Sequence, residues 1–226
     1  MIFAVSFGKG GVGKSTIAHC LAHSQAFRKR FGSVALVDLD PQGSLSTIVR
    51  DRGDRPLQGV TFKQILGDKP AAEIKRLAAS HGAIVLDVPG HHGFAVKFAM
   101  SASDLVIVPC RSTLPDEAAL AEKTWPYLRD QPRADLRVVI VPSMTHPQSR
   151  PETHAAYFRA LLPDLFRVSA VPFPSRSVYE VYNRDGLCLA EYAEAVKGNQ
   201  RARSQADRAI ADIESLAKEI LKHAAT

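Results

Sequence analysis

Residues 8–15 read Gly-Lys-Gly-Gly-Val-Gly-Lys-Ser, the most informative run of residues in the chain. It fits the pattern G-x-x-x-x-G-K-[ST], in which backbone N–H groups and the N-terminus of the following helix surround a phosphate. An apolar run, Ile2–Phe7, precedes the motif, and a helical pattern begins near Lys14. We therefore predict a nucleoside triphosphate site, with Lys14 on the β and γ phosphates and the hydroxyl of Ser15 on Mg²⁺.

A second lysine, Lys9, stands near the start of the same loop. The loop curls away from it, so Lys9 cannot easily reach the γ-phosphate of its own nucleotide, whereas a second subunit facing this one could receive it. The run from Lys9 to Thr16 resembles the deviant Walker A motif of the ParA/MinD ATPases. That resemblance implies an ATP-sandwich homodimer in which Lys9 contacts the phosphates of the partner. The loop residues that it assigns to nucleotide binding are Gly10, Gly11, Val12, Gly13, Lys14, Ser15 and Thr16.

Length and composition indicate one soluble domain, residues 1–226, in the cytoplasm. The hydrophobic content of 46% and the charged content of 23% are typical of a globular chain with a substantial core. No stretch approaches the ~18 continuous apolar residues of a membrane span. The three cysteines, Cys20, Cys110 and Cys188, are widely spaced and form no metal-ligand pattern, which indicates buried reduced thiols. The net charge of +6 favours a polyanionic partner without proving one.

Apolar strands alternate with helical patterns along the chain. This alternation predicts an α/β fold, a doubly wound and mostly parallel sheet of seven or eight strands with helices on both faces. The expected strands are Ile2–Phe7, Val34–Asp38, Ala83–Val88, Leu105–Val108, Leu136–Val141 and Phe166–Val171. The expected helices are Lys14–Phe31, Ser44–Arg52, Ala71–Ser80, Phe94–Ser101, Asp116–Arg129, Pro151–Leu161, Val178–Asn183, Cys188–Val196 and about Gln200–His223.

Three carboxylates follow predicted strands, at the sheet edge where such folds bind ligands. Asp38 and Asp40 end one strand and Asp87 ends another. Carboxylates beside a triphosphate repel it unless a cation intervenes, so the cluster implies Mg²⁺. The segment Asp38-Leu39-Asp40-Pro41-Gln42 is similar to the second signature of ParA-type ATPases. The resemblance implies that Asp40 positions or activates the attacking water, that Asp38 helps to organise Mg²⁺, and that Asp87 is the Walker B aspartate.

The sequence favours ATP over GTP. GTPases of this broad class read guanine with Asn-Lys-x-Asp or Thr-Lys-x-Asp after a late strand, and here the matching segment, residues 141–145, has neither lysine nor aspartate. A later turn, residues 170–174, resembles the base-contacting turn of the family. It makes Pro172 and Phe173 candidates for packing on adenine, although a loop made rigid by proline explains them as well.

The resemblance leaves three functions open. ParA-type members bind non-specific DNA as ATP dimers and are released when a ParB-like or other cargo adaptor stimulates hydrolysis. MinD-type members dock on membranes, and metabolic relatives are small-molecule kinases or ligases. The C-terminal helix mixes acidic with basic residues and lacks a bulky aromatic anchor, so membrane docking is not favoured. We expect DNA phosphate contacts from Arg176, Lys197, Arg201 and Arg203, with Arg184 and Arg208 near them.

Overall fold

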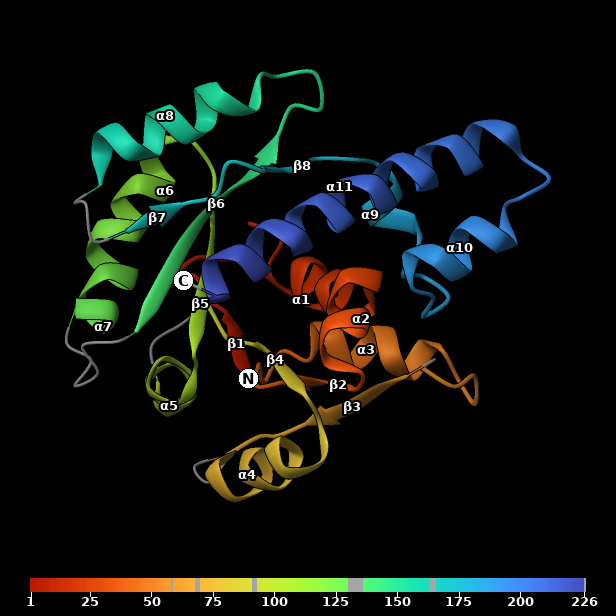
Figure 1. Cartoon of the computed structure of the whole chain (residues 1–226), viewed down its shortest axis with the longest axis horizontal. Coiled ribbons are helices and arrows are strands. Elements are labelled where there is room, and N and C mark those ends of the chain that lie inside the picture. Colours follow the sequence, from red (N-terminus) through yellow and green to blue (C-terminus); the bar gives the residue numbers. More distant parts are fainter. Residues whose placement is uncertain (58, 68–69, 91–92, 130–135, 163–165, 226) are drawn as a thin grey trace.

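A parallel sheet forms the centre of the molecule in the computed structural model (Figure 1). The structure describes residues 1–57, 59–67, 70–90, 93–129, 136–162 and 166–225. Seven of the strands in these ranges follow the order β3-β2-β4-β1-β5-β6-β7, and β8 pairs with β6 off this path. The strands are β1 Ile2–Val5, β2 Val34–Asp38, β3 Val60–Gln64, β4 Ala83–Asp87, β5 Leu105–Cys110, β6 Arg137–Thr145, β7 Arg167–Val168 and β8 Phe173–Pro174.

Helices cover both faces of the sheet, as the alternating pattern predicts (Figure 1). On one face lie α1 Lys14–His23, α2 Gln25–Phe31, α3 Ser44–Asp51, α9 Val178–Val181, α10 Leu189–Ala195 and α11 Gln200–Ala225. On the other face lie α4 Pro70–Ser80, α5 Phe94–Ala102, α6 Leu114–Ala119, the π-helical turn η1 Leu120–Thr124, α7 Trp125–Arg129 and α8 Pro151–Leu161. Successive strand side chains point to opposite faces, so each strand contributes to both cores.

The C-terminal helix α11 packs on the protein itself. Its apolar stripe, which includes Ile213, Leu216 and Ile220, is buried in the same core as β1 and α1. The structure thus accounts for the amphipathic pattern of this helix without a membrane. Within the described ranges, no helix is long and apolar enough to cross a bilayer. All three cysteines are free thiols and buried, as expected.

Two features of the fold correct the sequence-based expectations. The edge strand β3 was not expected, because its polar residues Thr61, Lys63 and Gln64 are exposed or nearly so, and only Val60 and Phe62 turn toward the core. Edge strands carry such polar residues because one side of them remains unpaired. The turn Phe173–Pro174, expected as a loop, pairs with β6 as β8.

Two predicted helices are interrupted. The expected helix over residues 14–31 is divided at Ser24, whose backbone is extended and whose hydroxyl accepts a hydrogen bond from the N–H of Phe27. Ser24 is the N-cap of α2, and such a cap replaces one missing backbone partner at a helix start. The expected helix over residues 116–129 begins earlier, at Leu114, and contains the π-helical turn η1.

The strand register brings the carboxylates together. Asp38 is the partner of Asp87 across the β2–β4 pair, and Asp87 is the partner of Val5 across the β4–β1 pair. Since β1 runs directly into the phosphate loop, both aspartates lie at the carboxyl edge beside that loop. This is the location where open α/β sheets bind their ligands.

Candidate nucleotide site

The phosphate loop has the backbone conformation that its glycines permit. Gly11 and Gly13 have φ values of 75° and 88°, in the left-handed region that other residues rarely adopt. Gly13 is the N-cap of α1, so the first N–H groups of that helix are available to an anion. Gly90, after β4, approaches the loop so closely that a Cβ at this position would lie 3.1 Å from Nζ of Lys14.

An open cavity of about 670 Å³ lies over this loop. Its volume is within the range of small-molecule and cofactor sites. The loop and the start of α1 form one wall, and residues from the β2–α3 connection, from α3, from β6 and from the segment after α9 form the rest. The lining residues are Gly10, Gly11, Gly13, Lys14, Ser15, Thr16, Asp40, Gln42, Ser44, Thr47, Ile48, Asp51, Met144, Asn183 and Arg184.

Lys14 points inward at the base of this cavity. Its ammonium donates a hydrogen bond to the carbonyl oxygen of Lys9 at 3.0 Å, and the residue is only 9% exposed. Burial lowers the pKa of Lys14, while the charges of Asp87 and Asp40 act in the opposite direction. A cation held in this way beside the helix N-terminus suits a phosphate group.

Asp87 is the carboxylate that fits a metal ion. It is 1% exposed, and its Oδ2 atom is buried without a hydrogen-bond partner in the described part of the chain. Burial raises the pKa of Asp87 to about 7, although a hydrogen bond from Ser15 lowers it. A buried, unpartnered oxygen next to a serine hydroxyl is a donor set that Mg²⁺ accepts. Among the described residues, no group of three or more His, Cys, Asp or Glu side chains is placed to hold a metal ion.

Asp38 has a different environment. It is fully buried, and its Oδ1 accepts a hydrogen bond from the N–H of Asp40 at 2.9 Å. Its Oδ2 accepts from both the N–H and the hydroxyl of Ser46, at 2.9 and 2.6 Å. Asp38 therefore anchors the turn that leads into α3, and its predicted help in organising Mg²⁺ stays a prediction.

Asp40 lies at the mouth of the cavity. Its Oδ1 accepts a hydrogen bond from the N–H of Gln42 at 2.9 Å, which fixes the carboxylate in the turn after β2. Asp40 is half-buried and lines the cavity together with Lys14. A carboxylate at this position has access to both the ligand space and solvent. Its role toward water stays a prediction.

Lys9 does not line the cavity. Its ammonium lies 2.5 Å from Oδ1 of Asp116, a fully buried carboxylate at the start of α6. Arg111 pairs with the other oxygen of Asp116, also at 2.5 Å. The side chain of Lys9 is 32% exposed, so one side of it faces solvent. The loop thus has one lysine in the cavity and one directed away from it.

The sequence of the chain matches a known family. Residues 3–223 match the family described as CobQ/CobB/MinD/ParA nucleotide binding domain. The chain belongs to this family. The resemblance of residues 9–16 to the ParA/MinD motif, and the doubly wound fold that it implies, are confirmed.

Relatives of known name cover nearly the whole chain. The "Protein ParA" of Rhizobium radiobacter is 25% identical over 223 residues, 98% of this chain and 96% of the relative. A putative plasmid partition protein of Borrelia burgdorferi B31, solved with AMPPNP, has a TM-score of 0.63 at 19% identity and covers 98% of both chains. A cobyrinic acid a,c-diamide synthase of Mycobacterium smegmatis, solved with ADP and magnesium, has a TM-score of 0.61 at 21% identity, with 89% of this chain and 96% of that one covered. The structural likenesses establish the shared fold.

The structure does not support the prediction that Phe173 packs on adenine. The ring is 1% exposed and packs against the ring of Tyr179, with centroids 4.8 Å apart. It also lies under the phosphate loop, because a Cβ on Gly13 would come within 3.1 Å of it. A buried ring offers no face to a base, so Phe173 supports the loop. Pro172 is half-buried, and its contact with adenine stays a prediction.

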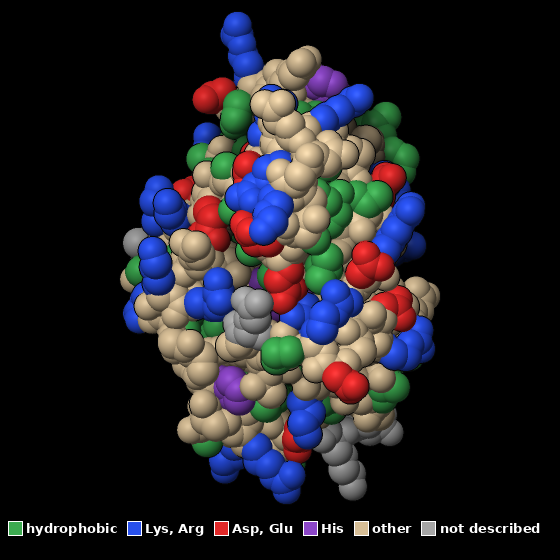
Figure 2. Space-filling view, turned by 90° about the vertical axis from the view of Figure 1, so that its right-hand side faces the viewer, with side chains coloured by type: hydrophobic (Ala, Val, Ile, Leu, Met, Phe, Trp, Pro, Cys, Tyr) green, Lys and Arg blue, Asp and Glu red, His purple; other side chains and the backbone are tan. Residues whose placement is uncertain are grey.

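The predicted DNA-binding residues do not form one group. Arg176 pairs with Asp212, and Arg203 pairs with Glu194 and Asp207. Lys197 and Arg201 are exposed and form no ion pair with other described residues. Figure 2 shows the right-hand side of Figure 1, where Lys and Arg atoms alternate with acidic side chains over the surface. The basic residues of this face are therefore interspersed with acidic ones.

Several residues that line the nucleotide cavity were not predicted to do so. Arg184, expected near DNA, lines the nucleotide cavity with Asn183. Met144 also lines it and has a φ of 53°, the one positive value outside glycine in the described ranges. Strain in a non-glycine residue is common at functional sites. Met144 lies near the end of β6, at the ligand-binding edge of the sheet, and that position is the signal that could have identified it.

Proposed function

We propose that this protein is a Mg²⁺-dependent ATPase that forms an ATP-sandwich homodimer, binds non-specific DNA in that state and positions a cargo. The proposal rests on the different positions of the two lysines of the phosphate loop. Lys14 faces the nucleotide cavity of its own chain, whereas Lys9 faces away from it. A lysine that does not serve its own cavity is available to a neighbouring subunit.

The nucleotide part of the proposal uses residues that line the cavity, together with the buried Asp87 beside Ser15. Lys14 and the N–H groups at the start of α1 bind the phosphates, and the hydroxyl of Ser15 with the carboxylate of Asp87 holds Mg²⁺. The ion, when bound, neutralises charge on the phosphate oxygens. Asp40 orients the attacking water from the cavity mouth. Hydrolysis to ADP and phosphate depends on positioning and electrostatics, so turnover is slow until a second cation is supplied.

Dimer formation supplies that cation in our proposal. Lys9 exchanges Asp116 for the phosphates of the partner's nucleotide. Asp116 keeps Arg111 as its counter-ion after the exchange, so the buried carboxylate is not left unpaired. This second ion pair makes release of Lys9 less costly.

The DNA surface of the proposal is centred on the start of α11. Arg201 and Arg208 are seven residues apart on this helix and both are exposed, so they share one face, and Lys197 precedes it. Contacts of this kind bind phosphates without reading base sequence. The ParA name of the Rhizobium relative supports a partition or positioning role with a ParB-like or other adaptor. The protein would be cytoplasmic, and nucleoid-associated when ATP is bound.

One cosedimentation experiment tests this function against its alternatives. The protein is incubated with non-specific DNA or with anionic liposomes, each with ATP or ADP. DNA binding only with ATP, falling steeply with salt, supports the proposal. Liposome binding would indicate a MinD-like membrane adaptor, although the apolar face of α11 is already buried. No response to either surface would favour a small-molecule kinase or ligase on this fold.

A further inference from the structure

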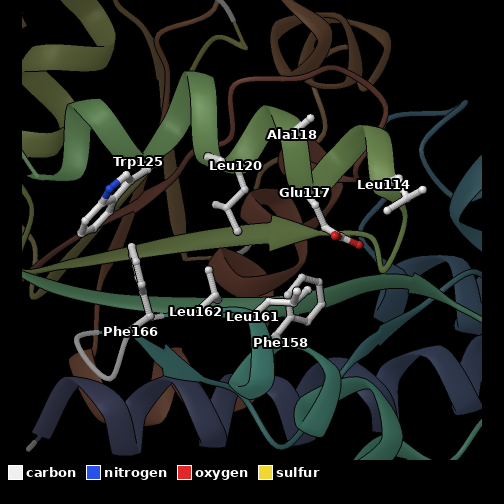
Figure 3. Close-up of a pocket in the computed structure, with 10 residues that line it drawn as sticks. Leu114, Glu117, Ala118, Leu120, Trp125, Phe158, Leu161, Leu162 and Phe166 are labelled. Carbon is white, nitrogen blue, oxygen red and sulfur yellow. The ribbon is translucent and has the colours of Figure 1, made fainter.

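A second cavity, which shares no lining residue with the nucleotide cavity, lies between two helical walls on one face of the sheet (Figure 3). One wall is the continuous segment α6–η1–α7, and the other is α8. We call this cavity the α6–α8 groove. It has a volume of about 410 Å³, and its lining is mainly apolar. Figure 3 shows Leu114 and Glu117 near one end and Trp125 and Phe166 at the other.

The rim of the α6–α8 groove exposes hydrophobic side chains. Leu114 is 78% exposed and Leu161 is 50% exposed. In the described part of the chain, only two other large hydrophobic residues, Leu66 and Phe94, are exposed to a similar degree. Two such residues on one rimmed cavity form the kind of apolar patch that marks a binding site.

Glu117 places a negative charge in the α6–α8 groove, so a ligand of the groove should carry a positive charge. Its carboxylate projects from α6 into the groove (Figure 3). The Oε1 atom is buried, and no described residue donates a hydrogen bond to it. A carboxylate oxygen in apolar surroundings without a donor is unfavourable, and a cation with N–H groups would satisfy it. The groove therefore complements an apolar ligand that carries one positive charge.

The shape of the groove favours a helix as the ligand. Its first wall extends from Leu114 to Trp125, a length of about 16 Å at the helical rise per residue. The lining positions 114, 117, 118, 121 and 125 recur at helical spacing along this wall. A third helix that lies between two helical walls buries side chains at i, i+3, i+4 and i+7. The wall also contains the π-helical turn η1, and such turns are frequent at functional sites.

We propose that the α6–α8 groove is the docking site for an amphipathic helix of a partner protein. The helix presents bulky apolar side chains at helical spacing and one lysine or arginine that pairs with Glu117. This site is separate from the nucleotide cavity, and helix binding itself does not depend on the proposed function.

The same helical wall contacts the phosphate loop with its inner face. Asp116 holds Lys9, and the hydroxyl of Thr124 accepts a hydrogen bond from the N–H of Gly8 at 3.0 Å. A Cβ on Gly8 would lie 2.6 Å from Cβ of Lys123, so loop and wall are in close contact. A helix docked in the groove therefore alters the surroundings of Lys9. This consequence, a change in ATP turnover, rests on the proposed function.

A displayed library of helical peptides tests the docking site. The library is selected on the full chain and counter-selected on Leu161→Asp, a substitution at a half-exposed position. We expect enriched peptides with apolar residues at helical spacing and one Lys or Arg. Their affinity should fall about tenfold or more with Leu161→Asp and with Leu114→Asp, as expected for loss of a central apolar contact. Leu66→Asp is the matched control outside the groove and should leave affinity unchanged.

Charge reversal tests the role of Glu117. Glu117→Lys should shift the selection from peptides with a basic residue to peptides with an acidic one, because the complementary charge is reversed. Circular dichroism melts verify that each variant is folded. The proposal is overturned if no helical sequence is enriched, or if enriched peptides bind the wild type and both leucine variants equally well.

ATP turnover measured with and without the best peptide separates the two proposals. Peptide binding with a changed rate supports the coupling to Lys9. Peptide binding to a protein that never hydrolyses ATP refutes the proposed function and leaves the docking site intact. ATP hydrolysis and ATP-dependent DNA binding without any peptide binding refute the docking site alone.

Discussion

Lys9 and Asp116, 107 residues apart in the sequence, form an ion pair within one chain at 2.5 Å. The carboxylate is fully buried, whereas the lysine is 32% exposed. Under the proposed function, the lysine intended for a partner subunit is held in its own subunit. The free energy of dimerisation then includes the cost of breaking the ion pair between Lys9 and Asp116.

Weakening the pair should favour the dimer. Asp116→Asn keeps the shape of the side chain and removes its charge, so Lys9 is released at lower cost. We expect the ATP-dependent dimer to form about three- to tenfold more tightly, since a partly exposed ion pair contributes about 1 kcal/mol. Sedimentation velocity with a non-hydrolysable ATP analogue measures this. In a Lys9→Ala background the same substitution should have no effect on dimerisation, and an equal effect in both backgrounds would contradict the coupling.

The two lysines of the loop should separate binding from assembly. Lys14→Ala removes the cation inside the cavity and should abolish nucleotide-dependent dimers by weakening ATP binding strongly. Lys9→Ala should leave ATP affinity within about twofold of wild type, because Lys9 does not line the cavity. Titration with a fluorescent ATP analogue gives the affinities. Equal loss of ATP affinity in both variants would assign Lys9 to its own nucleotide.

Asp40 should contribute to ATP hydrolysis rather than to ATP binding. Asp40→Ala removes a carboxylate at the cavity mouth but leaves Lys14, Ser15 and Asp87 in place. We expect hydrolysis to fall by about 100-fold or more, within the range for loss of a general base or water-orienting group. An ATP dimer should accumulate as a result. Phosphate release and light scattering measure the two effects, and unchanged turnover would refute the assigned role.

DNA binding should depend on the unpaired cations of the described chain. Arg201→Ala and Lys197→Ala should each reduce the salt slope of DNA affinity by about 0.9, the change for one lost phosphate contact. Arg176→Ala should have a smaller effect on the slope, because Arg176 already pairs with Asp212. Electrophoretic mobility shifts over a salt series give the slopes. Equal slope changes for Arg176 and Arg201 would show that the Asp212 pair opens on DNA.

The sequence predicted the centre of the sheet and the loop for one physical reason. Buried parallel strands are continuous apolar runs, and β2 and β4 are of this kind, each ending in an aspartate. The edge strand β3 could not be recognised, because Lys63 and Gln64 interrupt its apolar pattern. A strand can be recognised from its local composition only where all of its residues are buried.

Pairing between distant residues could not be predicted. Nothing near Lys9 in the sequence indicates Asp116, and nothing near Arg176 indicates Asp212. The burial of Phe173 was hidden for the same reason, because only the folded chain places its ring under Gly13. Motif recognition identified the residue types at the site, whereas their partners are a property of the fold.

Acid stability should depend on Glu191, whose carboxylate pairs with the guanidinium of Arg52. Burial alone would raise the pKa of Glu191, but hydrogen bonds from Arg52 and from the N–H of Cys188 overcome this and lower it to about 2. A lowered carboxyl pKa contributes stability that is complete above the unfolded value near 4.5 and is lost as the pH falls toward 2. The expected contribution at neutral pH is about 3 kcal/mol.

Glu191→Gln should therefore destabilise the protein strongly at pH 7 and progressively less between pH 4.5 and 2. Urea unfolding midpoints at several pH values measure the difference between variant and wild type. Burial lowers the pKa values of His19 and His23, and the charge of Glu191 raises that of His23, so the comparison is made in a His23→Gln background to isolate Glu191. Glu194→Gln, at an exposed pair with Arg203, is the control and should change stability by less than about 1 kcal/mol. A difference that stays constant from pH 7 to pH 2 would mean that Glu191 stabilises the fold through its shape and packing rather than its charge.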